Sequence, residues 1–145
     1  MNKELFIALQ DRLKEQVPAL RWVDAEMGQL NVVPRPPVAF PCCLVDMRYL
    51  QCRSLTAGAQ RVAAQFTLRV AFQGCGSSCS EAPTSVRERA LEHMDTLEEI
   101  HRALQWWSFG RRINPLQRVS VVPERRSDNL KVYTMVYDTE FQEGR

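Results

Sequence analysis

The sequence has little of what most enzymes and membrane proteins need. Its 145 residues include two histidines, and no Gly-rich nucleotide-binding pattern or P-loop is present. No apolar run approaches the roughly 20 residues needed to cross a bilayer, and the polar start Met1–Glu4 leads us to expect no signal peptide. Charge of one sign is not in excess either, since 19 basic and 17 acidic residues give a net charge of +2. That balance argues against a strongly basic nucleic-acid-binding arm and against an acidic disordered tail.

Five cysteines are present, and their pattern bears on the cellular compartment. They are Cys42, Cys43, Cys52, Cys75 and Cys79. Because their number is odd and no secretion signal is expected, we expect free thiols in a reducing, cytosolic compartment. Cys75 and Cys79 are spaced CxxxC in a loop of small residues, whereas zinc sites typically use two CxxC-like pairs. We therefore expect loop thiols without a metal or cofactor, with a disulfide formed in air as the alternative.

Two segments have the apolar spacing of amphipathic helices. In residues 3–16, Leu5, Leu9 and Leu13 recur every four positions, and Pro18 ends the helix because it lacks an N–H. In residues 84–105, an apolar stripe runs along the whole segment. Its members are Val86, Ala90, Leu91, Met94, Leu97, Ile100 and Leu104.

The clearest strand is residues 61–72, which alternate strictly with period 2. Its expected core face consists of Val62, Ala64, Phe66, Leu68, Val70 and Phe72. Other β-compatible segments are 20–23, 38–54, 119–122 and 130–141, and 30–33 is expected to extend the first of these or to form a second short strand. Pro34–Pro37 is expected to be a stiff connector, with a proline-rich ligand for another domain as the alternative.

The composition and the order of these segments predict the fold class. With 45% hydrophobic and 25% charged residues, the chain can bury a core without staples, and we expect residues 1–145 to form a single domain. The order is a helix, a β-rich block, a second helix and a terminal hairpin. Because strands follow strands without alternating helices, we predict an α+β fold with a mainly antiparallel β-sheet and two helices packed on one face.

The sequence offers few catalytic candidates. A nucleophilic site needs a Cys or Ser beside a His and an orienting carboxylate. The histidines, His93 and His101, lie on the second predicted helix among glutamates, where histidines are usually solvated surface residues. We therefore expect that the protein is not an enzyme.

Aromatic and basic residues gather after the second helix. The group comprises Trp106, Trp107, Phe109, Arg111 and Arg112, and a second basic pair follows at Arg125–Arg126. Such residues can stack on bases and neutralise phosphates, but they are also enriched at protein interfaces. The net charge of only +2 favours a protein interface over nucleic-acid binding, and core packing at the helix end is a third interpretation.

The second face of the long strand gives a similar choice. It carries Arg61, Gln65 and Arg69 between small residues. A solvent-facing sheet surface has this character, and so does the lining of a ring. Together with the 74–83 loop and the Trp106–Arg112 segment, these residues are our candidates for contacts with another copy or a partner.

The order and length of these elements resemble the tail terminator and tail-completion proteins of long-tailed bacteriophages and related prophages, a family of minor tail and head–tail joining proteins. The resemblance covers about residues 3 to 142. It runs through the first helix, the proline-bearing entry Pro37–Pro41, a hairpin of 44–53 and 61–72, a polar loop, the helix 84–105 and a closing hairpin of 119–123 and 130–141. The family has no catalytic motif to match, and the cysteine-containing loop and the double tryptophan are departures.

The resemblance implies a structural role. Such proteins assemble as a ring, commonly a hexamer, on the end of the tail tube, stop its polymerisation and form the surface that joins the head connector. The implied partners are further copies of the chain, the tail tube protein and the head–tail connector protein. The implied location is the bacterial host cytoplasm during assembly, and the virion tail in an intact phage. Two other interpretations stay open: a small adaptor module that binds protein through the sheet face and the aromatic-basic segment, and an enzyme that uses a cysteine.

Overall fold

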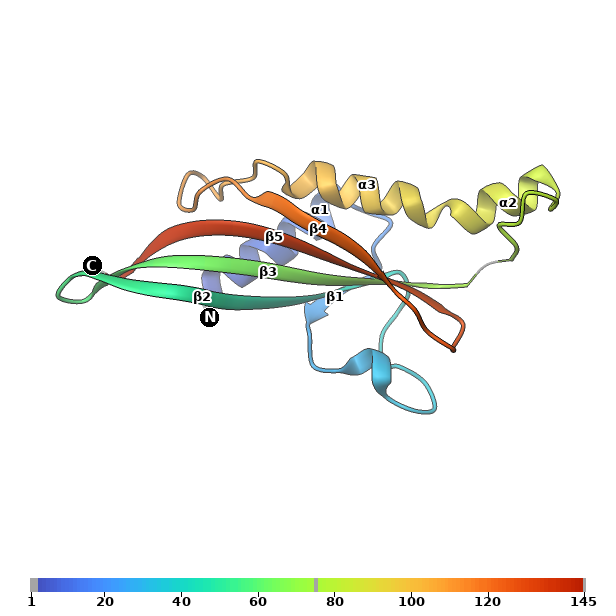
Figure 1. Ribbon diagram of the computed structural model, residues 1–145, viewed down its shortest axis with the longest axis horizontal. Coiled ribbons are helices and arrows are strands. Elements are labelled where there is room, and N and C mark those ends of the chain that lie inside the picture. Colours follow the sequence, from blue (N-terminus) through green and yellow to red (C-terminus); the bar gives the residue numbers. More distant parts are fainter. Residues whose placement is uncertain (1–2, 75, 145) are drawn as a thin grey trace.

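The chain forms a long, twisted β-sheet with helices lying along it (Figure 1). The structure is a computed structural model and describes residues 3–74 and 76–144. In chain order, its elements are α1 (Lys3–Gln16), β1 (Trp22–Ala25), the short 3₁₀ helix η1 (Gln29–Asn31), β2 (Cys42–Thr56), β3 (Ala59–Gln73), α2 (Thr84–Leu91), α3 (His93–Leu104), β4 (Gln117–Glu124) and β5 (Leu130–Gly144).

Within the described residues, five strands form one sheet in the order β1-β2-β3-β5-β4. β1 runs parallel to β2, and each of the other neighbouring pairs is antiparallel. β2 and β3 form a long hairpin that turns at Gly58, where a φ of +83° lies in the left-handed region that favours glycine. The predicted α+β fold with a mainly antiparallel sheet is confirmed.

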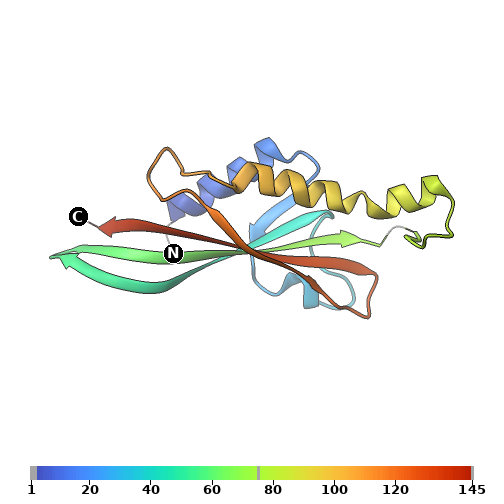
Figure 2. The same ribbon diagram turned by 45° about the horizontal axis from the view of Figure 1, so that its top comes forward.

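The main core lies between the sheet and the helices, which cover one face of it (Figure 2). Leu5, Leu9 and Leu13 of α1 are buried, as their spacing on one side of the helix predicts. The six residues predicted for the core face of β3 are buried as well, and they join Ile100 and Leu104 of α3 in one cluster. The predictions for the first helix and the long strand are therefore confirmed, although the strand extends over 59–73.

The second predicted helix, over 84–105, is present but bent, because the chain changes direction at Glu92 between α2 and α3. There the Glu92 amide donates to the Arg89 carbonyl and the Asp95 amide donates to the Glu92 carbonyl, so two consecutive turns are tighter than an α-helix. β3 has already ended at Gln73, and α2 projects past the end of the sheet (Figure 1). As a result, Val86 of the predicted stripe is exposed.

The segment 30–33 is not a strand, and β1 begins two residues later than predicted. η1 occupies Gln29–Asn31 because Gly28, with a φ of +80°, turns the chain, and the Gln29 side chain bonds the carbonyl of Ala25 at 2.9 Å. Leu30 thereby enters a second apolar cluster on the face opposite the helices. Its other buried members are Cys42, Leu44, Ala71 and Val132.

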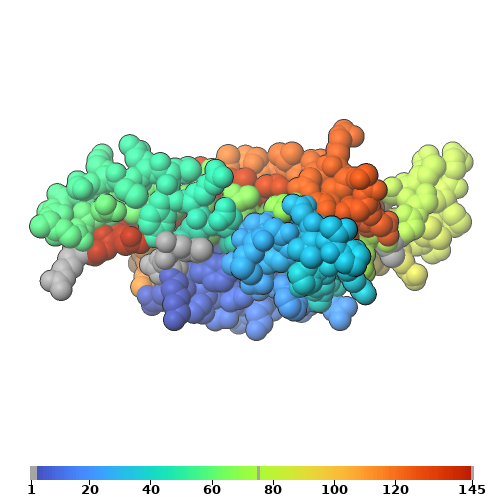
Figure 3. Space-filling model, turned by 90° about the horizontal axis from the view of Figure 1, so that it is seen from below, coloured from blue at the N-terminus to red at the C-terminus, as the bar shows by residue number. Residues whose placement is uncertain are grey.

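The β1–β2 connection, residues 26–41, therefore covers part of the sheet face that the helices leave open, and it forms a lobe there (Figure 3). Pro34–Pro37 lies in irregular backbone within this lobe, as predicted for a connector. We call the uncovered remainder of this sheet face the open face. The sheet is thus buried on both sides near Cys42 and on the helix side alone along most of its length.

Candidate interaction surfaces

Arg61 and Gln65, two of the candidate contact residues, lie on the open face and contact β5. Arg61 Nε lies 3.7 Å from Glu140 Oε1, and Gln65 Nε2 donates a hydrogen bond to Asp138 Oδ1 at 3.0 Å. Both residues remain half-buried. Because polar pairs that water can reach contribute little to stability, these two contacts hold the side chains only weakly.

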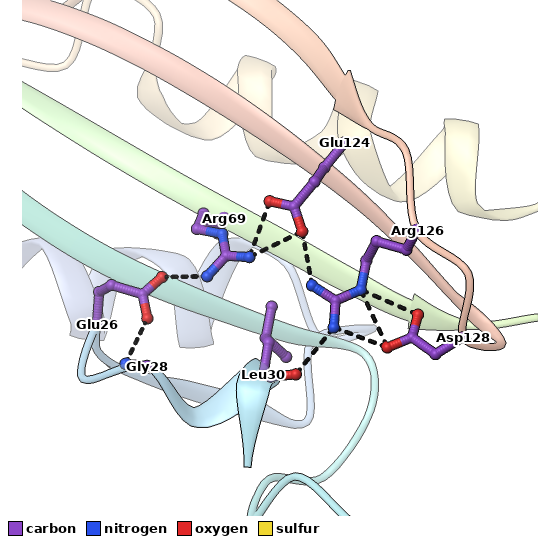
Figure 4. A network of polar contacts seen from close by, with 7 residues as sticks. All are labelled: Glu26, Gly28, Leu30, Arg69, Glu124, Arg126 and Asp128. Atoms are coloured by element: carbon purple, nitrogen blue, oxygen red, sulfur yellow. Dashed lines mark hydrogen bonds and ion pairs between the residues drawn. The ribbon is translucent and has the colours of Figure 1, made fainter. Parts of the chain in front are cut away.

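Arg69, the third candidate on this strand, is not an exposed contact residue. Its side chain is 18% exposed, and its guanidinium donates to Glu26 Oε1 at 3.0 Å and to both carboxylate oxygens of Glu124 at 2.8 and 3.0 Å (Figure 4). Glu26 follows β1 and Glu124 ends β4. The expectation of exposure is wrong because carboxylates from two distant segments converge on this one side chain.

Arg126 extends this network across the lobe (Figure 4). Its side chain is 12% exposed. Its Nη1 donates to Glu124 Oε2 at 2.6 Å, and its Nη2 donates to Asp128 Oδ2 at 2.7 Å and to the Leu30 carbonyl at 2.9 Å. The bond to Leu30 fixes η1 over the second apolar cluster. The network therefore joins β3, the end of β4 and the β4–β5 turn to the β1–β2 connection.

Three members of the network, Glu124, Arg126 and Asp128, have pKa values shifted in the direction that favours their ionised forms. Burial opposes the ionisation of Glu124, but hydrogen bonds from Arg126 and Arg69 outweigh burial and lower its pKa. Hydrogen bonds to Asp128 and Glu124 raise the pKa of Arg126. No buried side-chain nitrogen or oxygen in the described part of the chain lacks a hydrogen-bond partner. The arrangement is suited to holding segments together, because its arginine and carboxylate groups pair with one another.

The aromatic-basic segment after α3 divides into packed and exposed residues. Trp107 and Phe109 pack against the main core, with ring centroids 5.8 Å apart. Arg112 lies over the Phe109 ring at 4.6 Å and pairs with both carboxylate oxygens of Glu4 at 2.7 and 2.9 Å. These contacts attach the segment to α1. Trp107, Phe109 and Arg112 therefore take part in packing at the helix end, which was the third interpretation of this segment from the sequence.

Arg112 is itself exposed, and so are Trp106 and Arg111, the two remaining members of the segment. Trp106 is 67% exposed, and both residues have positive φ values, of 69° and 67°, which are uncommon for residues other than glycine. The Trp106 amide donates to the Leu116 carbonyl and the Leu116 amide donates to the Trp107 carbonyl, both at 2.9 Å. The backbone is thus fixed while the Trp106 indole projects outward.

The structure does not bring the two groups of candidates together. Trp107 packs into the core on the helix side, whereas Arg61 and Gln65 project from the opposite face of β3, because alternate residues of a strand face opposite sides. The 74–83 loop lies at the far end of β3 and leads into α2. Of its cysteines, Cys79 is an exposed free thiol, and Cys75 lies outside the described residues.

The histidines pack against β5, and the expectation that they are solvated is wrong for His93, which is buried. His93 Nε2 lies 3.2 Å from the Tyr133 hydroxyl, and His101 Nδ1 lies 2.9 Å from the Tyr137 hydroxyl. Burial lowers the pKa of both histidines, and the charges of Lys131 near His93 and Arg118 near His101 lower it further. Both rings therefore bind α3 to the sheet in their neutral form.

The thiols differ sharply in their surroundings. Cys42 and Cys43 are free and buried, where cysteine packs as a small apolar residue, while Cys52 on β2 is exposed. Burial raises the pKa of Cys42 to about 11, so its reactive thiolate is scarce at neutral pH. Within residues 3–74 and 76–144, no three or more His, Cys, Asp or Glu side chains form a group that could hold a metal ion.

Sequence reasoning missed the apolar side chains exposed on β4. Val119 and Val122 are 56% and 55% exposed, and Val121 is exposed to a smaller extent. The available signal was the sequence VSVV at 119–122, which places valines on both faces of the strand. β4 nevertheless lies at the edge of the sheet, where fewer side chains are covered. An edge strand presents backbone N–H and C=O groups that are able to pair with another chain.

Comparison with known proteins adds no relative. No protein-family model matches the chain, and no curated protein matches it in sequence. Within the described residues, no helix is both long and apolar enough to span a bilayer.

Proposed function

We propose that this chain is a structural subunit of the phage tail-terminator type. Copies of it assemble as a ring on the end of a tail tube, end the polymerisation of the tube and form the surface that joins the head connector. The chemistry is that of interfaces, and the subunit itself transforms no substrate.

The order of the packed elements is the observation that carries this proposal. An N-terminal helix, the long β2–β3 hairpin, a polar loop, the bent α2–α3 helix and the closing β4–β5 hairpin follow one another along the chain. This is the order on which the resemblance to tail terminators rests. The helices lie on one face of the sheet (Figure 2), which leaves the open face, both sheet edges and α2 for contacts with other molecules.

An adaptor module is the second candidate function, and the exposure of Trp106 favours it. A tryptophan that is 67% exposed on a fixed backbone is a typical anchor for a partner protein. An adaptor of this type remains a monomer until it meets its partner. The two functions therefore differ in self-association and in their response to tube ends.

Light scattering and negative-stain imaging test the proposal. The chain is measured alone and then mixed with tail tubes assembled from a purified phage tail tube protein. We expect closed rings of about six subunits, or a monomer that forms such rings at tube ends. A Trp106→Ala variant serves as the comparison, because the loss of tube-end binding in this variant alone assigns the contact to that residue. A chain that stays monomeric and ignores tube ends contradicts the proposal and favours the adaptor.

A further inference from the structure

We propose that copies of this chain join edge to edge, the outer edge of β4 in one copy pairing with the free half of β2, residues 46–56, in the next. Closure of the resulting chain of subunits into a ring rests on the proposed function, whereas the pairing itself does not. The ligand of each edge is thus a strand of a second copy, recognised through backbone hydrogen bonds and apolar side chains.

The sheet leaves two edges without a neighbour. β1 pairs with β2 only from Cys42 to Val45, and the Glu26 amide donates a hydrogen bond to the Val45 carbonyl. Beyond that point, no described strand lies on this side of β2, and β4 ends the sheet on the other side. Each free edge presents backbone N–H and C=O groups that another strand can pair with.

The strand directions allow this pairing to repeat. Because β2–β3, β3–β5 and β5–β4 are each antiparallel, β4 runs opposite to β2. A neighbour rotated about an axis roughly along the strands keeps its strand directions, so its β2 meets β4 in the antiparallel sense. The two edges are different surfaces, and a contact between different surfaces generates a ring when the rotation closes. Pairing of β4 with a second β4 instead leaves the β2 edge uncovered.

Both free edges carry exposed apolar side chains, whose removal from water would stabilise a contact. Val119 and Val122 of β4 are more than half exposed, and Leu50 and Leu55 on the free half of β2 are exposed as well. The paired stretch on β4 has clear limits. The Arg118 amide already donates to Gln105 Oε1 at 3.0 Å, and Pro123 has no N–H to donate. The pairing is therefore centred on the valines between these two positions.

The fold also restricts the register. β1 occupies the β2 edge up to Val45, so Glu124 at the end of the incoming β4 lies opposite residue 46 or later, and Val121 lies opposite residue 49 or later. β2 ends at Thr56, so Arg118, at the other limit of the paired stretch, lies opposite residue 56 or earlier. Val121 therefore falls opposite one of the residues 49–53. Within one copy, Val121 pairs with Met135, Met135 with Leu68, and Leu68 with Val45. Val121 and Val45 therefore lie at the same height along the strands.

The neighbouring copy is consequently shifted along the strands by at least four residues, about 13 Å at roughly 3.3 Å per residue. A closed sheet requires such a stagger, because its strands tilt relative to the axis. The offset between the two free edges is thus the geometry that closure needs.

An engineered disulfide tests both the contact and its register. Cys52 is an exposed free thiol on the free half of β2 and pairs with Val62, which faces the helix side. Val121 pairs with Met135 on that same side, whereas Val122 pairs with Thr134 on the open face. In a Cys75→Ser, Cys79→Ser background, we expect Val121→Cys to form an intersubunit disulfide with Cys52 under mild oxidation, because bridged Cβ atoms lie about 4 Å apart.

Val122→Cys is the matched control, since it is the adjacent residue and faces the opposite side of the sheet. We expect a ladder of covalent multimers for Val121→Cys on non-reducing gels and at least tenfold less for Val122→Cys. Removal of Cys52 from the Val121→Cys variant abolishes the ladder. A covalent dimer that survives this removal indicates β4–β4 pairing and overturns the proposal.

A second comparison does not depend on disulfide geometry. Val122→Lys places a charge at the proposed contact, and we expect it to lower the weight-average mass measured by light scattering toward that of the monomer. Val33→Lys is the control, because Val33 is 86% exposed in the β1–β2 connection, away from both free edges.

The outcomes separate this inference from the proposed function. Oligomers that form without the Cys52 disulfide and tolerate Val122→Lys overturn edge pairing and leave the ring in place. A cross-linked chain that never caps a tube supports edge pairing and contradicts the tail-terminator function. A chain that stays monomeric, gives no cross-link and ignores tube ends overturns both.

Discussion

Arg69 and Arg126 illustrate how single side chains in this protein hold distant segments together. Each lies between carboxylates and is largely withdrawn from solvent. Exposed ion pairs contribute little, but breaking a pair that is mostly buried leaves its partner charged and poorly solvated. The Arg126 side chain also donates to the Leu30 carbonyl, so its loss releases η1 as well as Glu124.

Arg126→Gln is therefore expected to lower the free energy of unfolding by about 2 to 3 kcal/mol. Arg125→Gln, at the exposed neighbouring position, is the control and is expected to change it by less than about 0.5 kcal/mol. Urea unfolding followed by tryptophan fluorescence measures both variants. Equal effects of the two substitutions contradict the role given to the network.

The two histidines make stability depend on pH. Burial lowers their pKa values below the ordinary 6.5, so between the folded pKa and 6.5 the unfolded chain binds more protons than the folded one. The free energy of unfolding is therefore largest above pH 6.5, as far as these groups are concerned, and decreases as the pH falls through that value.

Urea unfolding between pH 7.5 and 5.5 checks this prediction, since most carboxylates titrate below that range. We expect the double variant His93→Gln, His101→Gln to show a flatter dependence than the natural chain, although it is less stable at pH 7.5. An unchanged dependence in the double variant shows that other groups cause it.

At the scale of elements, the spacing of the two His–Tyr pairs explains how α3 lies along β5. His93 and His101 are eight residues apart on a helix, about 12 Å at roughly 1.5 Å per residue. Tyr133 and Tyr137 are four residues apart on a strand, about 13 Å at roughly 3.3 Å per residue. The matched distances allow both hydrogen bonds to form at once. The sequence did not reveal this match, because it depends on which helix lies over which strand.

α1 is held by its leucine stripe. Leu9 is fully buried, whereas Ile7 on the same helix is exposed. We expect Leu9→Ala to lower the free energy of unfolding by about 3 kcal/mol, because it removes buried methyl groups and leaves a cavity. Ile7→Ala is the matched control and is expected to cost less than about 1 kcal/mol. Chemical unfolding of both variants checks the assignment, and a cost for Ile7→Ala as large as that for Leu9→Ala argues against it.

Elements with a strong local period could be predicted, and elements shaped by distant contacts could not. The alternation in 61–72 and the spacing of Leu5, Leu9 and Leu13 report burial directly, so β3 and α1 followed from the sequence. The bend at Glu92 involves two i→i−3 hydrogen bonds, which the helical spacing of the apolar residues did not indicate. η1 depends on a turn at Gly28 and on a bond between Arg126 and Leu30, two residues far apart in the chain.

The candidate surfaces show the same division. Local pattern placed Arg61 and Gln65 on the open face, where they lie, but it did not reveal the carboxylates that enclose Arg69. It grouped Trp106 with Trp107, although only the packing of the loop decides that one is exposed and the other packs on the core. The exposed valines of β4 became informative only when the order of strands placed β4 at an edge.

At the scale of the whole molecule, the surfaces left open by the fold agree with a subunit that associates with further copies. One sheet face is partly open, and the two free edges run in opposite directions and are offset along the strands. The net charge of +2 arises from basic and acidic residues in nearly equal number, and such a surface suits protein neighbours. The partner that we propose for such a subunit is the end of an ordered polymer.

The elongation of tail tubes tests the central claim most directly. Purified tube protein is allowed to polymerise in the presence of increasing amounts of this chain, and tube lengths are measured by negative-stain imaging. The tail-terminator account predicts that elongation stops at about one ring of this chain per tube, with the ring visible at a single end. Tubes that grow to the same length with and without the chain, at amounts well above one ring per tube, contradict it.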